Sequence, residues 1–243
     1  MRHRVTAALL VIAMTAGVSD AVDFRVTTKL YEGKRLEPSA EHRILFDDGW
    51  VVDLPQVHSR FVTVYDPAAG EVTLLDRHTQ VQTVLAIDDL VKITAQARVA
   101  AADATNRERL GLDAEVESSD RVIGHMIRFG HFEYHTTTQV PTEQAIATDY
   151  GRFVILASRL NLVRRLGAPP FGRMTLSDHL TARGELPLET TLTLHHGEEA
   201  AEYRSTHRLE ESLSDTDRRR IEEVKGMMKL YQKVAFQQFP SDS

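Results

Sequence analysis

The chain has 243 residues, of which 42% are hydrophobic, and 29 lysine or arginine residues against 35 aspartate or glutamate residues give a formal net charge of −6. This length suffices for one sizeable domain or two small ones, and the negative charge argues against a nucleic acid or an anionic membrane surface as partner. The sequence has no cysteine, which excludes both a disulfide framework and a lipid-bearing cysteine, so a packed core must stabilise the fold.

The amino end has the pattern of a secretory signal peptide. Arg2 and Arg4 precede an apolar run at residues 5–18, and Ser19-Asp20-Ala21 then places small residues at the two positions that a signal peptidase reads. The apolar run is about fourteen residues, shorter than the roughly 20 needed to span a bilayer. We therefore expect a cleaved signal peptide at residues 1–21, one mature domain at residues 22–243 without a transmembrane segment, and a periplasmic or secreted location.

Six strands are expected in succession after the signal peptide. Residues 24–31 alternate between apolar and polar side chains, and Asp47-Asp48-Gly49 is a strong hairpin signal between two apolar runs. A meander with turns near residues 66–70 and 76–78 follows. Because no helix interrupts these segments, they favour a consecutive antiparallel sheet. The six expected strands are residues 24–31, 42–46, 50–54, 61–65, 71–75 and 80–85.

Helices and further strands follow the meander. An alanine-rich pattern predicts one helix over residues 90–109 with Asp88 as its N-cap, and three strands are expected between residues 114 and 140. Thr142 is the predicted cap of a helix over residues 143–166 that Gly167 ends. A short helix at residues 177–182 precedes two paired strands, residues 186–194 and 199–209.

A final amphipathic helix ends the chain. Residues 214–217 supply its cap, and its apolar side chains form a single stripe. The sequence thus predicts an α+β fold, in which a curved antiparallel sheet of about eleven strands forms a half-open barrel covered by three or four helices. The stripe consists of Ile221, Val224, Met228, Tyr231 and Ala235.

The best candidate for metal chemistry is the segment from His131 through Glu133 to His135. On a strand these side chains share a face, but positions four apart are separated by roughly 13 Å, too far for both histidines to bind one zinc ion. His131 with Glu133 could contribute to a site completed from elsewhere, although a solvated polar face is the favoured interpretation. His195-His196 falls at a turn, where an exposed histidine pair is the favoured interpretation.

Catalytic motifs are missing from the sequence. The acidic pairs Asp47-Asp48 and Asp88-Asp89 fit turn and cap roles, and no nucleophile elbow, phosphate-binding glycine loop, His-Glu-x-x-His motif or dinucleotide fingerprint occurs. We therefore expect no catalytic residue, no metal and no cofactor.

The apolar strand faces carry the functional prediction. Nine side chains on the early strands are expected to point to one side of the curved sheet. A packed core is the favoured role for any one of them, but a curved sheet of this size can also enclose a ligand cavity. These predicted cavity residues are Phe24, Val26, Leu30, Trp50, Val52, Val62, Val64, Val72 and Leu74.

The order of elements resembles the superfamily of periplasmic Lol-type lipoprotein carriers. The resemblance rests on a signal peptide, a strand ending in Val64-Tyr65-Asp66-Pro67, the strand Val72-Thr73-Leu74-Leu75-Asp76, an alanine-rich helix and the late strand at residues 186–194. It covers residues 24–209 in the order of elements. The resemblance implies a half-open antiparallel barrel with helical lids and an apolar cavity that takes acyl chains.

Together these patterns indicate an exported, soluble, non-enzymatic carrier or binding protein. Its expected ligand is apolar or acylated, such as a lipid or a lipoprotein acyl chain, and its partner an outer-membrane or envelope protein. Two alternatives stay open at this point. One is a metal-dependent or other hydrolase that uses the His131/Glu133 strand, and the other is a structural or adaptor domain that binds no ligand.

Overall fold

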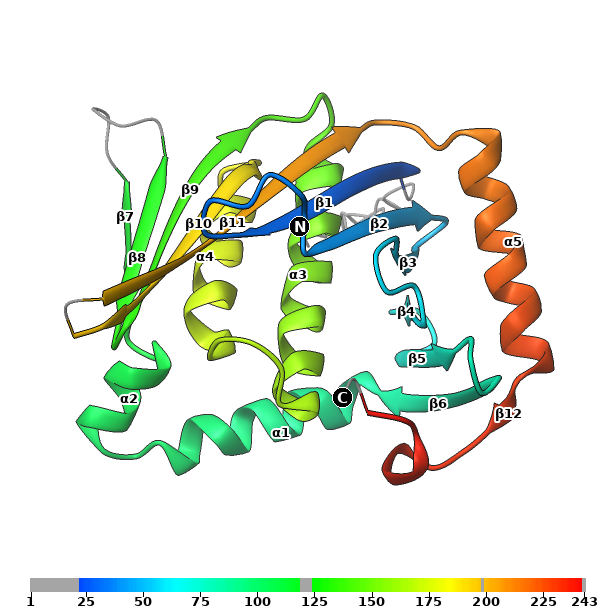
Figure 1. The fold of residues 1–243 in the computed structure, drawn as a ribbon, viewed down its shortest axis with the longest axis horizontal. Helices are drawn as coiled ribbons and strands as arrows, with labels where there is room; N and C mark the ends of the chain where they lie inside the picture. The colour runs from blue at the N-terminus through cyan, green and yellow to red at the C-terminus, as the bar shows by residue number, and fades with distance from the viewer. Residues whose placement is uncertain (1–21, 119–123, 198, 242–243) are drawn as a thin grey trace, which may run out of the picture.

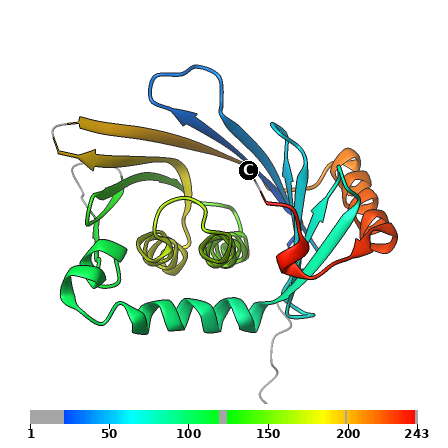
Figure 2. The ribbon, with the colours of Figure 1, turned by 60° about the horizontal axis from the view of Figure 1, so that its bottom comes forward.

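The computed structural model describes residues 22–118, 124–197 and 199–241, so the predicted signal peptide lies outside the described residues. The described chain has an α+β fold, in which one curved sheet wraps around a pair of helices (Figures 1 and 2). The sheet has twelve strands and does not close, which confirms the predicted half-open barrel with one strand more than expected.

The first six strands pair consecutively and antiparallel, as predicted. At the β2–β3 turn, Asp48 and Gly49 both have positive φ, the conformation that matches the twist of a tight hairpin. The sheet order is β12-β6-β5-β4-β3-β2-β1-β11-β10-β9-β8-β7. The strands are β1 (Phe24–Glu32), β2 (Ala40–Asp47), β3 (Trp50–Pro55), β4 (Phe61–Asp66), β5 (Glu71–Asp76), β6 (Val81–Ala86), β7 (Val116–Ser118), β8 (His125–Phe129), β9 (Phe132–Gln139), β10 (Leu186–His196), β11 (Glu199–Glu210) and β12 (Gln232–Lys233).

Two pairings join parts of the chain that are far apart in sequence. β1 pairs antiparallel with β11, so that Thr28 lies between His42 of β2 and His207 of β11. This pairing unites the early meander and the late strands in one sheet. β12 is a two-residue strand that pairs parallel with β6, which makes the sheet mixed rather than purely antiparallel.

The helices lie on both sides of the sheet. Helices α3 and α4 run side by side on the concave face, and α1 crosses beneath them (Figure 2), while α5 packs outside the meander. Gly151 lets α3 and α4 approach closely, because a Cβ at this position would clash with Thr181. The helices are α1 (Ile87–Ala100), α2 (Ala104–Leu110), α3 (Gln144–Arg164), α4 (Pro170–Ala182), α5 (Asp215–Leu230) and the short 3-10 helix η1 (Phe236–Gln238).

The predicted helix over residues 90–109 is wrong, because the structure contains two helices there. The Asp103 side chain accepts a hydrogen bond from the Asn106 backbone N–H and so caps a second helix, α2. Asp88 is not the N-cap of α1, as predicted, but lies in its first turn. The N-cap is Ala86.

The predicted ends of α3 and α4 also need correction. Thr142 donates its hydroxyl to Glu211 instead of capping α3, whose N-cap is Glu143. Arg165, not Gly167, ends α3 in the left-handed conformation. Helix α4 begins at Pro170 and is longer than the predicted residues 177–182, since proline is well tolerated at the first helical position.

The predicted cap of the final helix is confirmed. Ser214 and Asp217 form a reciprocal capping box at the start of α5. The helix ends at Leu230, so Tyr231 is its C-cap residue and Ala235 lies beyond it, outside the predicted stripe. Among the described residues, no helix is long and apolar enough to cross a membrane.

Three apolar clusters fill the fold. We call the sheet face toward α3 and α4 the inner face, and the face toward α5 the outer face. The largest cluster packs the inner face of β1–β5 against α1 and α3, and includes Phe24, Phe46, Val72 and Phe153. A second cluster packs the outer face of β2–β5 against α5, and a third packs β8 and β9 against α4.

Candidate ligand-binding site

The nine predicted cavity residues do not share one face of the sheet, so this part of the prediction is wrong. In the β4–β5 hairpin, Val62 lies opposite Leu75 and Tyr65 lies opposite Val72. Residues directly opposite each other in an antiparallel pair point to the same face, and side chains alternate along each strand. Val62 therefore shares a face with Leu75, whereas Val72 shares the other face with Tyr65.

Four of the nine residues lie on the outer face, under α5. Val52, Val62 and Val64 are at most 1% exposed there, and Trp50 packs partly against the same cluster. The Lys225 ammonium lies 5.7 Å from the centre of the Trp50 ring. Trp50 also lines an open pocket of about 440 Å³ between the β2–β3 turn and α5. These four residues therefore seat α5.

The other five residues lie on the inner face. Phe24, Val26, Val72 and Leu74 are at most 1% exposed and belong to the cluster beneath α3. Leu30 follows Phe24 and Val26 on the same face of β1 but is only partly buried. Burial on the inner face therefore stops about halfway along β1.

The partly exposed stretch continues onto the neighbouring strands. Leu30 lies opposite Ala40 of β2 and Ser205 of β11, and Tyr203 of β11 lies opposite Leu192 of β10. All of these side chains are partly exposed, although they face the helical side. We call this set the open inner section, and it consists of Thr28, Leu30, Ala40, His42, Leu192, Leu194, Tyr203 and Ser205.

A histidine–aspartate pair lies at the edge of this section. His42 Nδ1 is 2.7 Å from Asp53 Oδ1, and 37% of the His42 side chain is exposed. Burial disfavours the charged imidazolium, but the hydrogen bond and negative charge of Asp53 outweigh burial and raise the pKa of His42. Asp53 therefore fixes the His42 ring while the side chain stays partly open to solvent.

A buried polar chain lies beneath the same section. The Ser205 hydroxyl donates to the Thr190 carbonyl at 3.3 Å and therefore accepts from His207 Nε2 at 3.1 Å. With its proton on Nε2, His207 accepts at Nδ1 from the Tyr150 hydroxyl at 2.9 Å. Burial, with a contribution from the charge of Arg173, lowers the pKa of His207 to about 3. His207 is therefore neutral at physiological pH and fixes the orientation of Ser205.

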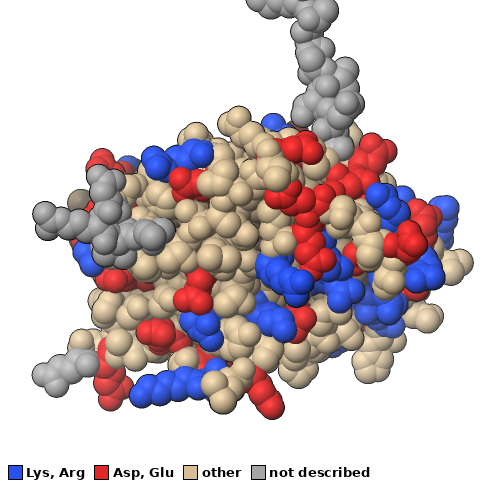
Figure 3. Space-filling view, turned by 90° about the horizontal axis from the view of Figure 1, so that it is seen from above, with Lys and Arg blue, Asp and Glu red and all other residues tan. Residues whose placement is uncertain are grey.

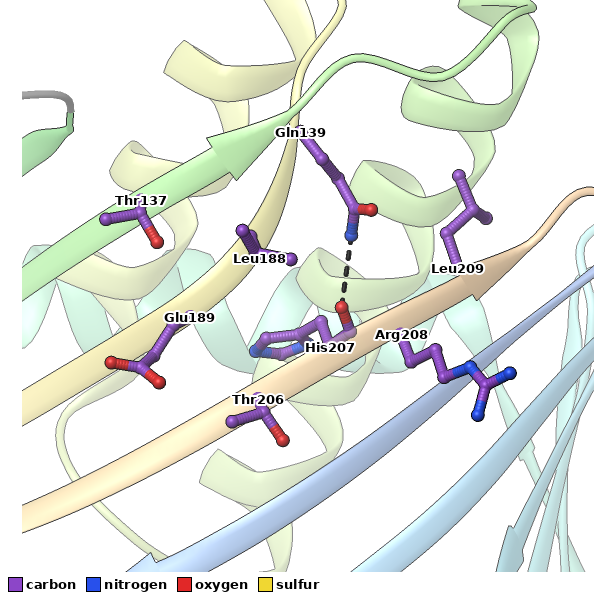
Figure 4. A pocket seen from close by; sticks show the side chains of 8 residues that line it. All are labelled: Thr137, Gln139, Leu188, Glu189, Thr206, His207, Arg208 and Leu209. Carbon is purple, nitrogen blue, oxygen red and sulfur yellow. Dashed lines mark hydrogen bonds between the residues drawn. The ribbon is translucent and has the colours of Figure 1, made fainter.

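A pocket opens on the sheet where β10 and β11 part (Figure 4). Their pairing ends at Glu189 and Thr206, beside a bulge after Pro187, and Gln139 bridges the gap by donating to the Pro187 and His207 carbonyls, both at 3.1 Å. The pocket has a volume of about 480 Å³. Proline cannot donate to a ladder, so Pro187 was the sequence signal for this irregularity. The lining residues are Thr137, Gln139, Leu188, Glu189, Thr206, His207, Arg208 and Leu209.

The segment around His131 does not gather a metal site. His131 is exposed in the turn between β8 and β9, while Glu133 forms an ion pair with Arg128 Nε at 2.7 Å. The Nε2 atom of His195 lies 4.0 Å from Glu133 Oε2. In the described ranges, no group of three His, Cys, Asp or Glu side chains is placed to hold a metal ion. The geometry gives no support to a hydrolase that uses His131 and Glu133.

Charges on the face seen from above are mixed. Basic and acidic side chains lie next to one another there rather than forming a field of one sign (Figure 3). Charges on β1 are paired as well, since Arg25 forms ion pairs with both Glu210 and Asp217.

A comparison with protein-family models gave no match, and a search of curated proteins gave no match either.

Proposed function

We propose that this protein is an exported carrier or binding protein that holds an apolar or acylated ligand against the open inner section. One observation carries the proposal. Helix α3 buries Phe24 and Val26 completely, whereas Leu30, on the same face of the same strand, is left partly exposed. A concave sheet whose apolar inner face is only partly filled by helices offers surface to a ligand.

The composition of the section suits a ligand with an apolar chain and a polar end. Leu30, Leu192 and Leu194 offer apolar contact, and the exposed edge of His42 offers a hydrogen bond. Each methylene removed from water contributes about 0.8 kcal/mol, so a chain of a dozen carbons gains roughly 10 kcal/mol before the cost of association is subtracted. With an association cost of about 4 kcal/mol, about 6 kcal/mol remains, which corresponds to a Kd in the tens of micromolar.

The same proposal places the protein in the periplasm or outside the cell. The signal-peptide pattern supports export, and the resemblance to lipoprotein carriers supports delivery of the ligand to an outer-membrane or envelope protein. A carrier of this kind needs an uncovered stretch of inner face, because its ligand must leave again.

The test is direct binding of a fatty acid to the purified mature chain. We expect native mass spectrometry to detect co-purifying lipid, and dodecanoate to bind by calorimetry. Leu30→Glu should weaken dodecanoate binding by about tenfold or more, because a carboxylate would replace an apolar contact. Leu36→Glu is the matched control, since Leu36 is 93% exposed in the β1–β2 loop.

Protein that is lipid-free as isolated and gives no heat with dodecanoate at tens of micromolar would contradict the proposal. That result would instead favour a structural or adaptor domain. Equal loss of binding in Leu30→Glu and Leu36→Glu would show that the ligand does not lie on the open inner section.

A further inference from the structure

Three polar atoms from three elements meet at the β7 end of the sheet. Ser118 Oγ of β7 lies 3.0 Å from His125 Nδ1 of β8 and 3.2 Å from His179 Nε2 of α4. The two imidazole nitrogens are 3.2 Å apart, so the three atoms form a closed triangle. This cluster lies outside the open inner section, and the ligand-binding proposal does not use it.

Glu185 fixes the orientation of His125. Its Oε2 atom accepts from His125 Nε2 at 2.7 Å, and its Oε1 atom accepts from Arg183 Nε at 3.0 Å. The Nδ1 atom of His125 is thereby turned toward the triangle. His125 is only 5% exposed, so this orientation is held by packing as well.

We propose that Ser118, His125 and His179 bind a divalent transition-metal ion of the zinc type. Zinc binds imidazole nitrogen at about 2.0–2.1 Å, and the corners of a triangle with these edges lie about 1.8 Å from its centre. An ion about 1 Å above the plane is therefore at bonding distance from all three atoms. A carboxylate behind a ligating imidazole, as Glu185 is here, is the usual outer support of such a ligand.

The open side of the triangle also suits a metal. Ser118 is exposed, which leaves a side of the triangle open to water as a fourth ligand. With two imidazoles and one hydroxyl, the site lacks the third His, Cys, Asp or Glu of a strong structural site, so it binds in the micromolar range. The ion would tie the β7–β8 hairpin to α4.

The test is calorimetric titration of the metal-free, untagged mature chain with Zn²⁺. We expect one site with a midpoint in the tens of micromolar and no binding of Mg²⁺, which prefers oxygen ligands. His179→Ala should weaken Zn²⁺ binding by about tenfold or more while leaving the circular dichroism unchanged. His131→Ala is the matched control, because His131 is an exposed histidine outside the triangle.

A second measurement separates this site from the other histidines of the chain. Co²⁺ held by the triangle should give visible absorption bands in the wild type and in His131→Ala, but not in His179→Ala. The proposal is overturned if Zn²⁺ binds no tighter than millimolar. It is also overturned if His179→Ala binds Zn²⁺ and Co²⁺ like the wild type.

Discussion

The two halves of the sheet differ in how many of their faces are covered. Strands β2–β5 are covered on the inner face by α1 and α3 and on the outer face by α5. Strands β8–β11 have helices on the inner face only. Helix α4 packs against β8 and β9, α3 reaches β11 through the hydrogen bond of Tyr150 to His207, and Leu188 of β10 is 48% exposed. Strands covered on both faces form a core. The face without a helix on the late strands is the outer one, whereas we propose the ligand at the open inner section, on β1, β2, β10 and β11.

The position of α5 causes this difference. Arg25 and Asp217 hold the start of α5 on β1, with Arg25 Nη1 2.7 Å from Asp217 Oδ2. Gln82 holds the other end, because its amide donates to the carbonyls of Met228 and Tyr231 at 2.8 and 2.7 Å. Helix α5 is therefore fixed at both ends over the meander and leaves the late strands uncovered.

The largest expected effect is on the unfolding free energy when one carboxylate is introduced into each half of the sheet. Val64→Asp puts a carboxylate between the sheet and α5, where Val64 is 1% exposed, and should cost about 3–5 kcal/mol of unfolding free energy. Leu194→Asp puts the same carboxylate on a partly exposed strand and should cost less than about 1 kcal/mol. Urea unfolding of the two variants measures both values. Equal costs would show that the late strands are as well covered as the meander.

A smaller effect concerns His207, where the two halves join. Its folded pKa of about 3 is far below the ordinary value of 6.5, so below pH 6.5 the unfolded chain gains a proton that the folded chain excludes. The resulting stability is complete above pH 6.5 and is lost as the pH falls toward 3. Between pH 7 and pH 5, this one group should lower the unfolding free energy by about 2 kcal/mol.

The measurement is urea unfolding of the wild type and of His207→Gln at both pH values. His207→Gln should lose this part of the pH dependence, whatever its stability at pH 7. His195→Gln is the control, because His195 is exposed near the end of β10. A wild-type protein and a His207→Gln variant with the same pH dependence would show that His207 is accessible to protons in the folded state.

The sequence predicts the strands of this fold better than their faces. Turn chemistry at Asp48-Gly49 and Gly70 and alternation along the strands sufficed for the consecutive antiparallel meander. The face to which each valine points depends on which residues of β4 and β5 lie opposite each other. Alternation within a single strand does not determine this register. Because both faces of β2–β5 are apolar, the pattern could not show which of them α5 covers.

The triangle of Ser118, His125 and His179 is not indicated by the sequence, for a related reason. Ser118, His125 and His179 come from separate elements, and no sequence spacing relates α4 to the β7–β8 hairpin. The sequence instead indicates the segment from His131 to His135, because its histidines lie close together along the chain. Tertiary packing, not sequence proximity, brings imidazoles together here.

The smallest expected effect is one on Trp50, and it separates the two faces most sharply. Trp50 lies on the outer face beside Lys225 and Met228 of α5, so its fluorescence should report on the docking of α5 and not on a ligand at the open inner section. Saturating dodecanoate should leave its emission maximum unchanged.

For the same reason, Val64→Trp should leave dodecanoate binding unchanged if the variant folds, because Val64 faces α5. Leu30→Trp should block binding, because a larger ring there would occupy the open inner section. Calorimetry with dodecanoate and Trp emission spectra of the wild type and both variants measure this. A clear shift of Trp50 emission with dodecanoate, or normal binding by Leu30→Trp, would place the ligand on the outer face, between the meander and α5.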